Sequence, residues 1–166
     1  MRFGGVDILI SNAGAAHQSS VEMLSQKSLR ESFELNFFAP LRLSRGFAGA
    51  LAKGEGAIVN VTSIAGHKIH PFAGSAYSIS KTALSGLTRE MANEFAELGV
   101  RVNAVAPGEI ETDMVQPEYE MLIPRIPLGH MGSPQDVARS IYYLASDDSS
   151  YVTGTEVWVT GGQHMF

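Results

Sequence analysis

Short apolar runs alternate with long helix-like segments along this chain, and that alternation constrains its fold more than any other feature. Four runs have the character of strands: Val6–Ser11, Ala57–Thr62, Arg101–Ala106 and Glu156–Val159. The first is almost continuously apolar and rich in β-branched residues, which predicts a strand covered on both faces. Strands separated by crossover helices form a mostly parallel sheet. The pattern therefore predicts an α/β fold.

Helical segments fill the intervals between these runs. The spacing of apolar residues predicts long helices over Ser28–Lys53 and Ser75–Leu98, the second stopped by Gly99. A third helix is expected to begin at Ser133 and to run to about Ala145, because Ser133 is followed by a proline and, three residues on, by an acid. We find no repeat or linker, so residues 1–166 are expected to form a single domain.

Composition excludes several classes of function. The 166 residues carry a net charge of −5 and no cysteine. An acidic balance argues against binding to nucleic acid or to an anionic membrane surface. The lack of cysteine removes disulfides, thiolate zinc sites and cysteine nucleophiles. No apolar run approaches the roughly 20 residues of a spanning helix, and the start of the chain lacks the apolar core of a signal peptide. We therefore expect a cytoplasmic protein.

The ends of the first three strands carry small or polar residues. They are Asn12-Ala13-Gly14, Ser63 and Pro107-Gly108. In open parallel sheets, ligands bind outside the carboxyl ends of the strands. These three segments are therefore expected to meet at one site.

Tyr77 and Lys81 form the next polar feature, near the start of the second long helix. Residues four apart share a helix face, and a nearby ammonium favours the phenolate and lowers the pKa of the tyrosine. Such a tyrosine can exchange a proton with a substrate oxygen, and the hydroxyl of Ser63 can donate to the same oxygen. The pair alone is common on exposed helices. Together with Ser63 at the end of the preceding strand, however, the pair indicates an active site.

Together these motifs resemble the short-chain dehydrogenase/reductase family, closest in style to the reductases of 3-oxoacyl carriers and small alcohols. The resemblance covers essentially the whole chain. The matching stretches are Asn12-Ala13-Gly14, Asn36 within LNFFAP, Val61-Thr62-Ser63, Tyr77-x-x-x-Lys81, Arg101-Val102-Asn103, Pro107-Gly108, Ile110 with Thr112, and the final YVTGTEVWVTGG.

The resemblance implies an oxidoreductase that moves a hydride between NAD or NADP and a small carbonyl or alcohol. Tyr77 would be the proton donor or acceptor, and Ser63 would hold the substrate carbonyl. Lys81 would lower the pKa of the tyrosine and bind the nicotinamide ribose, and Asn36 would hold a water in the proton relay. The cofactor-binding residues would be Asn12, Ala13, Gly14, Tyr77, Lys81, Pro107, Gly108, Ile110 and Thr112.

One part of the family pattern has no counterpart in this sequence. Members normally open with a strand and a TGxxxGxG turn that binds the pyrophosphate at a helix N-terminus. The expectation is therefore a partial Rossmann-like sheet without its first three strands, weakened cofactor binding and a coding frame upstream of Met1. It also leaves Val6–Ser11 as an apolar edge, which favours pairing with another chain. The long helices Ser28–Lys53 and Ser75–Leu98 carry more apolar surface than one sheet face needs. Members of the family pair such helices across subunits, so the resemblance implies a homo-oligomer, a dimer or a tetramer.

Two alternative functions stay open at this point. A relative that folds and associates without efficient turnover would fit the missing turn. An epimerase or dehydratase could use the same tyrosine and lysine, although the short segment Met114–Ile126 that would cap the substrate favours simple reductases. His67 and His70 flank Lys68, but no third ligand has suitable spacing, so we expect no metal site.

Overall fold

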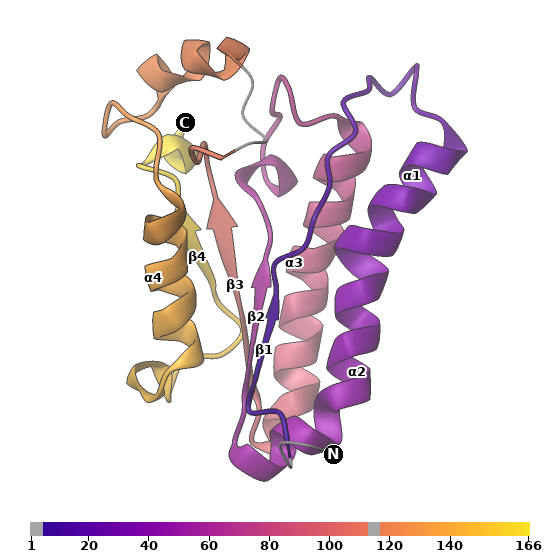
Figure 1. Cartoon of the computed structure of the whole chain (residues 1–166), viewed down its shortest axis with the longest axis vertical. Coiled ribbons are helices and arrows are strands. Elements are labelled where there is room, and N and C mark those ends of the chain that lie inside the picture. Colours follow the sequence, from indigo (N-terminus) through magenta and orange to yellow (C-terminus); the bar gives the residue numbers. More distant parts are fainter. Residues whose placement is uncertain (1–4, 113–116) are drawn as a thin grey trace.

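A four-stranded parallel sheet forms the centre of the molecule (Figure 1). The computed structural model describes residues 5–112 and 117–166. The strands follow one another in the order β1-β2-β3-β4, and Ile8 of the first is in register with Ala57 of the second. The predicted parallel α/β fold is therefore confirmed. The strand bounds are β1 Ile8–Ser11, β2 Ala57–Val61, β3 Arg101–Pro107 and β4 Glu156–Val159.

Helices cover the two faces of the sheet unequally. Figure 1 shows α1, α2 and α3 on one face and α4 on the other. The predicted helix Ser28–Lys53 is not one regular helix, because a π-helical turn at Glu34–Phe38 separates α1 from α2. Short 3₁₀ turns follow α2 and α3. The helix bounds are α1 Gln26–Phe33, α2 Ala39–Leu51, α3 Ser75–Phe95 and α4 Pro134–Ala145.

The helix ends follow local rules that the sequence displays. Ser133 accepts a hydrogen bond from the backbone of Asp136, and the Asp136 carboxylate accepts one from the backbone of Ser133. This capping box satisfies two backbone N–H groups that α4 would otherwise leave without partners. Gly99 ends the α3 segment with a φ of 71°, in the left-handed region that favours glycine. Both predicted ends are confirmed.

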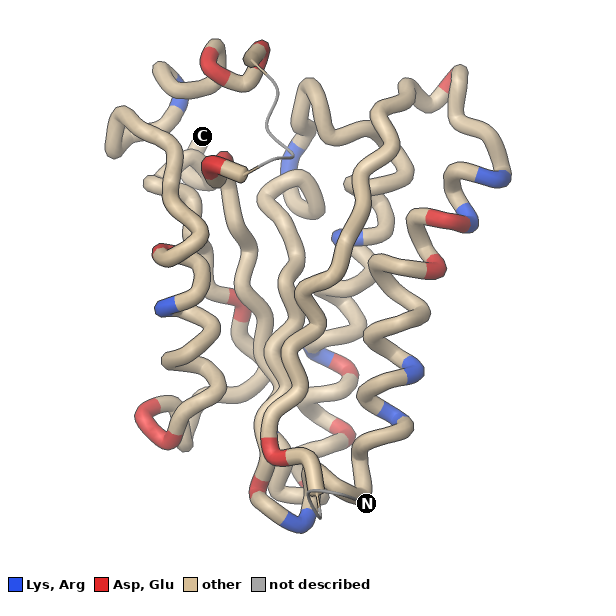
Figure 2. Tube along the Cα trace, in the orientation of Figure 1, with Lys and Arg blue, Asp and Glu red and all other residues tan. Residues whose placement is uncertain are grey.

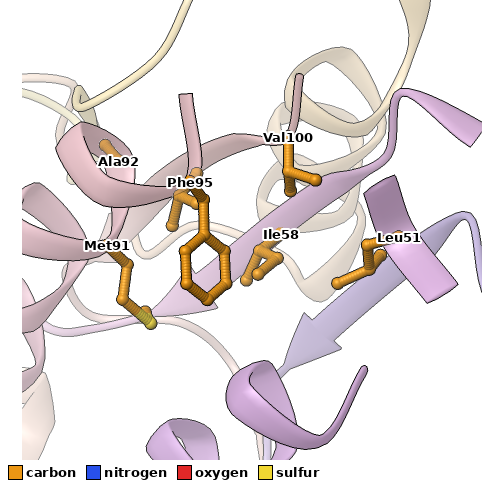
Figure 3. Close-up of a cluster of buried hydrophobic side chains, with 7 residues drawn as sticks. Leu51, Ile58, Met91, Ala92, Phe95 and Val100 are labelled. Atoms are coloured by element: carbon orange, nitrogen blue, oxygen red, sulfur yellow. The ribbon is translucent and has the colours of Figure 1, made fainter. Parts of the chain in front are cut away.

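The larger core cluster lies between the sheet and helices α2 and α3. Leu51 of α2, Ile58 of β2 and Met91 and Phe95 of α3 are all buried there (Figure 3). A second cluster on the opposite face joins Val59 and Val105 to α4. These contacts fix α3 against the sheet, so the first turn of α3 is held beside the carboxyl end of β2.

Strand β1 is an edge, as expected, but it is not covered on both faces. Ile8 is 49% exposed and Ile10 is 37% exposed, whereas Leu9 packs against the core on the side of α2. Helix α4, the helix on that face, packs instead against β2, β3 and β4. The prediction of a doubly covered first strand is therefore wrong for this chain.

Charged residues are spread over the outer elements. Figure 2 shows Lys and Arg along α1 and α2, with acidic residues on α1 and on the turn that follows it but none on α2. Two of these charges, Lys27 and Glu31, are paired at 3.9 Å on the surface of α1. Among the described residues, no helix combines the length and the apolar character needed to cross a bilayer.

Candidate active site

A cleft of about 1140 Å³ lies at the carboxyl ends of β1, β2 and β3. The structure brings the predicted site residues together there, which follows from the parallel sheet. Only Asn36 among them does not line the cleft. The predicted residues that line it are Asn12, Ala13, Gly14, Ser63, Tyr77, Lys81, Pro107, Gly108, Ile110 and Thr112.

Ser63 and Tyr77 face this cleft from adjacent elements. Ser63 lies two residues after β2 in an extended conformation, and its hydroxyl accepts a hydrogen bond from the backbone of Ala65 at 3.1 Å. Tyr77 lies in the first turn of α3, which begins after Gly74 with a φ of 79°. A Cβ at Gly74 would lie 2.4 Å from the carbonyl oxygen of His17, so this turn requires glycine.

Lys81 lies one turn further along α3, behind the tyrosine. Its side chain is almost fully buried, and its ammonium donates to the carbonyl oxygen of Val61 at 2.7 Å. The same nitrogen lies 5.6 Å from the centroid of the Tyr77 ring. Burial lowers the pKa of Lys81 from its ordinary 10.5 to about 8, because a low-dielectric site disfavours the ammonium.

The pKa of Tyr77 shifts in the direction opposite to the one expected from its spacing to Lys81. Burial raises this pKa above 10.0, while the Ser63 hydroxyl beside the phenol lowers it. The charge of Glu109 raises it further. Sequence spacing identified the neighbouring ammonium but not the burial, and in this structure the desolvation of the phenolate outweighs its stabilisation.

Asn36 lies behind the cleft and holds its wall together. It is fully buried on the π-helical turn, which carries its amide toward the first strand end. Its Oδ1 accepts from the backbone of Ala15, and its Nδ2 donates to the carbonyl oxygen of Ala15 and to the hydroxyl of Ser80. Asn36 therefore ties the segment after β1 to α3, one residue from Gly14.

The floor of the cleft is kept open by small residues. A Cβ at Gly14 would lie 3.3 Å from both Asn36 Oδ1 and Lys81 Nζ. A Cβ at Gly108 would lie 3.0 Å from Thr160. The lack of a Cβ at both glycines therefore lets the segments around the cleft pack closely, while Lys81 has N–H donors beyond the one used by Val61. These features fit the nicotinamide and ribose end of a dinucleotide.

Sequence reasoning missed the polar wall on the opposite side of this floor. Glu109, which follows Gly108, is buried and contacts His70 at 2.8 Å. Tyr119 lines the same side, within the helical turns Pro117–Arg125 of the predicted cap. Met114, where that cap was expected to begin, lies outside the described residues. A carboxylate next to a strand-end glycine was the signal that could have revealed this wall.

The two histidines of this region have separate partners. His67 pairs with Glu156 at 2.8 Å and lies edge-on to Trp158, whereas His70 pairs with Glu109. Within residues 5–112 and 117–166, no group of three or more His, Cys, Asp or Glu side chains is arranged to hold a metal ion.

Comparison with known proteins places this geometry in a family. Residues 1–164 match the family described as enoyl-(acyl carrier protein) reductase. Protein FixR of Bradyrhizobium diazoefficiens is 48% identical over 164 residues, and 3-oxoacyl-[acyl-carrier-protein] reductase FabG of Vibrio cholerae is 37% identical over 169 residues. The alignments cover 95% and 98% of this chain. They cover 59% of FixR and 68% of FabG.

Solved structures agree with the sequence comparison. A 3-oxoacyl-[acyl-carrier protein] reductase with bound NAD from Brucella melitensis superposes with a TM-score of 0.91 at 30% identity, over 96% of this chain and 63% of that one. A Thermus thermophilus protein gives 0.94 at 32% identity, over 99% of this chain and 72% of that one. The chain belongs to the short-chain dehydrogenase/reductase family, a family of oxidoreductases, and it spans about three fifths of the length of FixR.

Proposed function

We propose that this chain carries the catalytic site of an NAD(P)-dependent carbonyl reductase or alcohol dehydrogenase. The observation that carries the proposal is the convergence of Ser63, Tyr77 and Lys81 on one cleft at the carboxyl ends of parallel strands. The substrate would be a small carbonyl compound or alcohol. The acetoacetyl-CoA reductase of Rhizobium meliloti, which is 37% identical over 168 residues, is named for a substrate with a carbonyl group.

Tyr77 is the general acid or base in this proposal. In the reductive direction its phenol donates a proton to the carbonyl oxygen, and in the oxidative direction the phenolate takes that proton back. Ser63 donates a hydrogen bond to the same oxygen and positions it. A phenol is protonated at neutral pH, and burial raises the pKa of Tyr77 further, which suits donation to a carbonyl.

Lys81 and the small residues of the cleft floor would hold the cofactor. A bound NAD(P)H supplies the hydride that forms the new C–H bond. The ammonium of Lys81 would bind ribose hydroxyls, and Asn12, Ala13 and Gly14 would line one side of the cofactor. Pro107, Gly108, Ile110 and Thr112 would line the nicotinamide end. Asn36 keeps the wall in place through Ala15. By the family resemblance it would also position a water in the proton relay.

The test is oxidation of NADH or NADPH with a panel of small ketones. The chain should turn over at least one ketone, and Tyr77→Phe should lower that rate by about 10²–10⁴-fold, the usual contribution of general acid–base catalysis. Tyr151→Phe is the matched control, since Tyr151 is fully exposed and does not line the cleft.

The alternative function, folding and association without efficient turnover, makes a different prediction for the same assay. No ketone would then be reduced at a rate above that of Tyr77→Phe. Equal rates of ketone reduction in the unaltered chain and in Tyr77→Phe would contradict the proposed role of Tyr77.

A further inference from the structure

A buried carboxylate and a histidine form the polar wall of the cleft. Glu109 and His70 have side chains that are only 3% and 8% exposed, and Glu109 Oε1 lies 2.8 Å from His70 Nε2. Both residues line the cleft together with Tyr77. The carboxylate comes from the segment after β3 and the imidazole from the loop after Ser63, so two elements of the site supply the pair.

The hydrogen bonds of His70 fix its protonation state. Its Nδ1 accepts from the backbone N–H groups of Phe72 and Ala73, at 3.2 and 3.1 Å. A ring nitrogen that accepts hydrogen bonds carries no proton, so the proton resides on Nε2 and is donated to Glu109. In this tautomer the imidazole adds no charge to the wall.

One oxygen of the Glu109 carboxylate is available to accept a hydrogen bond from a ligand. Oε1 accepts from His70 and, at 3.1 Å, from Nε2 of Gln163. Within residues 5–112 and 117–166, the hydrogen bonds of Glu109 use Oε1 alone. Of the described residues that line the cleft, Lys81 is the one cation, and it is held behind Tyr77 by Val61.

We propose that Glu109 determines substrate specificity in this cleft, selecting neutral carbonyl compounds that bear a hydroxyl and rejecting carbonyl compounds that bear a carboxylate. The inference rests on the proposed function, since it places the substrate between Tyr77 and this wall. A ligand hydroxyl can donate to Glu109 Oε2. A ligand carboxylate would instead bring a second negative charge against a buried one, which weakens binding strongly.

Several charged and titratable groups surround Tyr77 in this site: Lys81 on its own helix, Glu109 and His70 in the wall, and Tyr119 from the cap. The charge of Glu109 reaches both tyrosines, because it raises the pKa of Tyr77 and of Tyr119. Glu109 therefore lies within electrostatic range of both tyrosines, and the proposed substrate would lie between them.

A matched pair of ligands tests the proposal by binding alone. 4-Hydroxy-2-butanone and acetoacetate have similar size and differ in a terminal hydroxymethyl or carboxylate group. Their affinities are measured by titrating the ¹⁵N-labelled chain and following the backbone signals of Ala73 and Gly108 at the cleft. The variants are Glu109→Gln, which keeps the shape and removes the charge, and Glu111→Gln, which removes an exposed charge outside the cleft.

The chain should bind 4-hydroxy-2-butanone at least about tenfold more tightly than acetoacetate. Glu109→Gln should bring the two affinities within about threefold of each other, mainly by tightening acetoacetate. Glu111→Gln should keep the original ratio. Equal affinities in the unaltered chain, no shift of the cleft signals with either ketone, or an unchanged ratio in a folded Glu109→Gln protein would each overturn the inference.

The unaltered chain alone decides the first two outcomes, so the test stands even where Glu109→Gln fails to fold. NAD(P)H oxidation, measured in parallel, separates this inference from the proposed function. Turnover without discrimination between the two ketones overturns the inference alone. Discrimination without turnover overturns the proposed function alone.

Discussion

Replacing Lys81 by methionine tests whether the site buries an ammonium. Methionine keeps most of the aliphatic length and removes the charge. Burial lowers the pKa of Lys81 from 10.5 to about 8, so the native state holds the proton less tightly than the unfolded chain does. Each unit of that difference corresponds to about 1.4 kcal/mol, so the charged side chain costs the fold about 3 kcal/mol at neutral pH.

The sign of the pH dependence follows from this shift. Below pH 8 the lysine is charged in both states, and the full cost is present. Between pH 8 and 10.5 the native lysine loses its proton while the unfolded one keeps it, so the cost disappears as pH rises. The advantage of Lys81→Met in free energy of unfolding should therefore fall by about 2–3 kcal/mol between pH 7 and pH 10.

Urea unfolding followed by circular dichroism measures this difference at each pH. The lost hydrogen bond to Val61 shifts the difference in free energy of unfolding by the same amount at every pH. The test therefore depends only on how this difference changes with pH. Lys27→Met is the control, since the Lys27 side chain is 84% exposed and its difference from the unaltered chain should stay flat. A flat difference for Lys81→Met as well would refute the burial of a titrating ammonium in this cleft.

Two further predictions concern the wall of the site and the edge of the sheet. Asn36→Ala removes the amide that pairs with both backbone groups of Ala15, so it should lower the free energy of unfolding by about 2–4 kcal/mol in the urea assay. The control Asn93→Ala, at an exposed position, should lower it by less than about 0.5 kcal/mol. Similar losses in the two variants would show that Asn36 does not stabilise the wall of the cleft. Sedimentation velocity should also show that the chain self-associates through the exposed apolar edge of β1. Ile8→Lys should weaken that association. A chain that stays monomeric at high concentration would contradict this prediction.

Much of the fold was predictable because its signals are local. The alternation of apolar strands and amphipathic helices predicted the parallel sheet, and Ser133 and Gly99 predicted helix ends that the structure confirms. The position of Ser63 and Tyr77 at one cleft followed from the same topology, since parallel strands bring their carboxyl ends to one edge.

The features that escaped prediction depend on contacts between distant segments. The π-helical turn around Asn36 leaves the apolar pattern of the helix almost unchanged, so periodicity does not reveal it. The pKa of Tyr77 depends on how deeply the phenol is buried, which spacing to Lys81 does not report. The pairing of Glu109 with His70 joins residues 39 positions apart.

Transfer of an isotope from the cofactor to the product tests whether this cleft carries out hydride transfer with Tyr77 as the proton donor. The chain is incubated with NADH or NADPH carrying deuterium at the transferable position, together with the ketone that it binds most tightly, and the product alcohol is analysed by mass spectrometry. We expect deuterium on the carbinol carbon and, in Tyr77→Phe, a transfer rate lower by about 10²–10⁴-fold. Alcohol without deuterium, or an unchanged transfer rate in Tyr77→Phe, would contradict it.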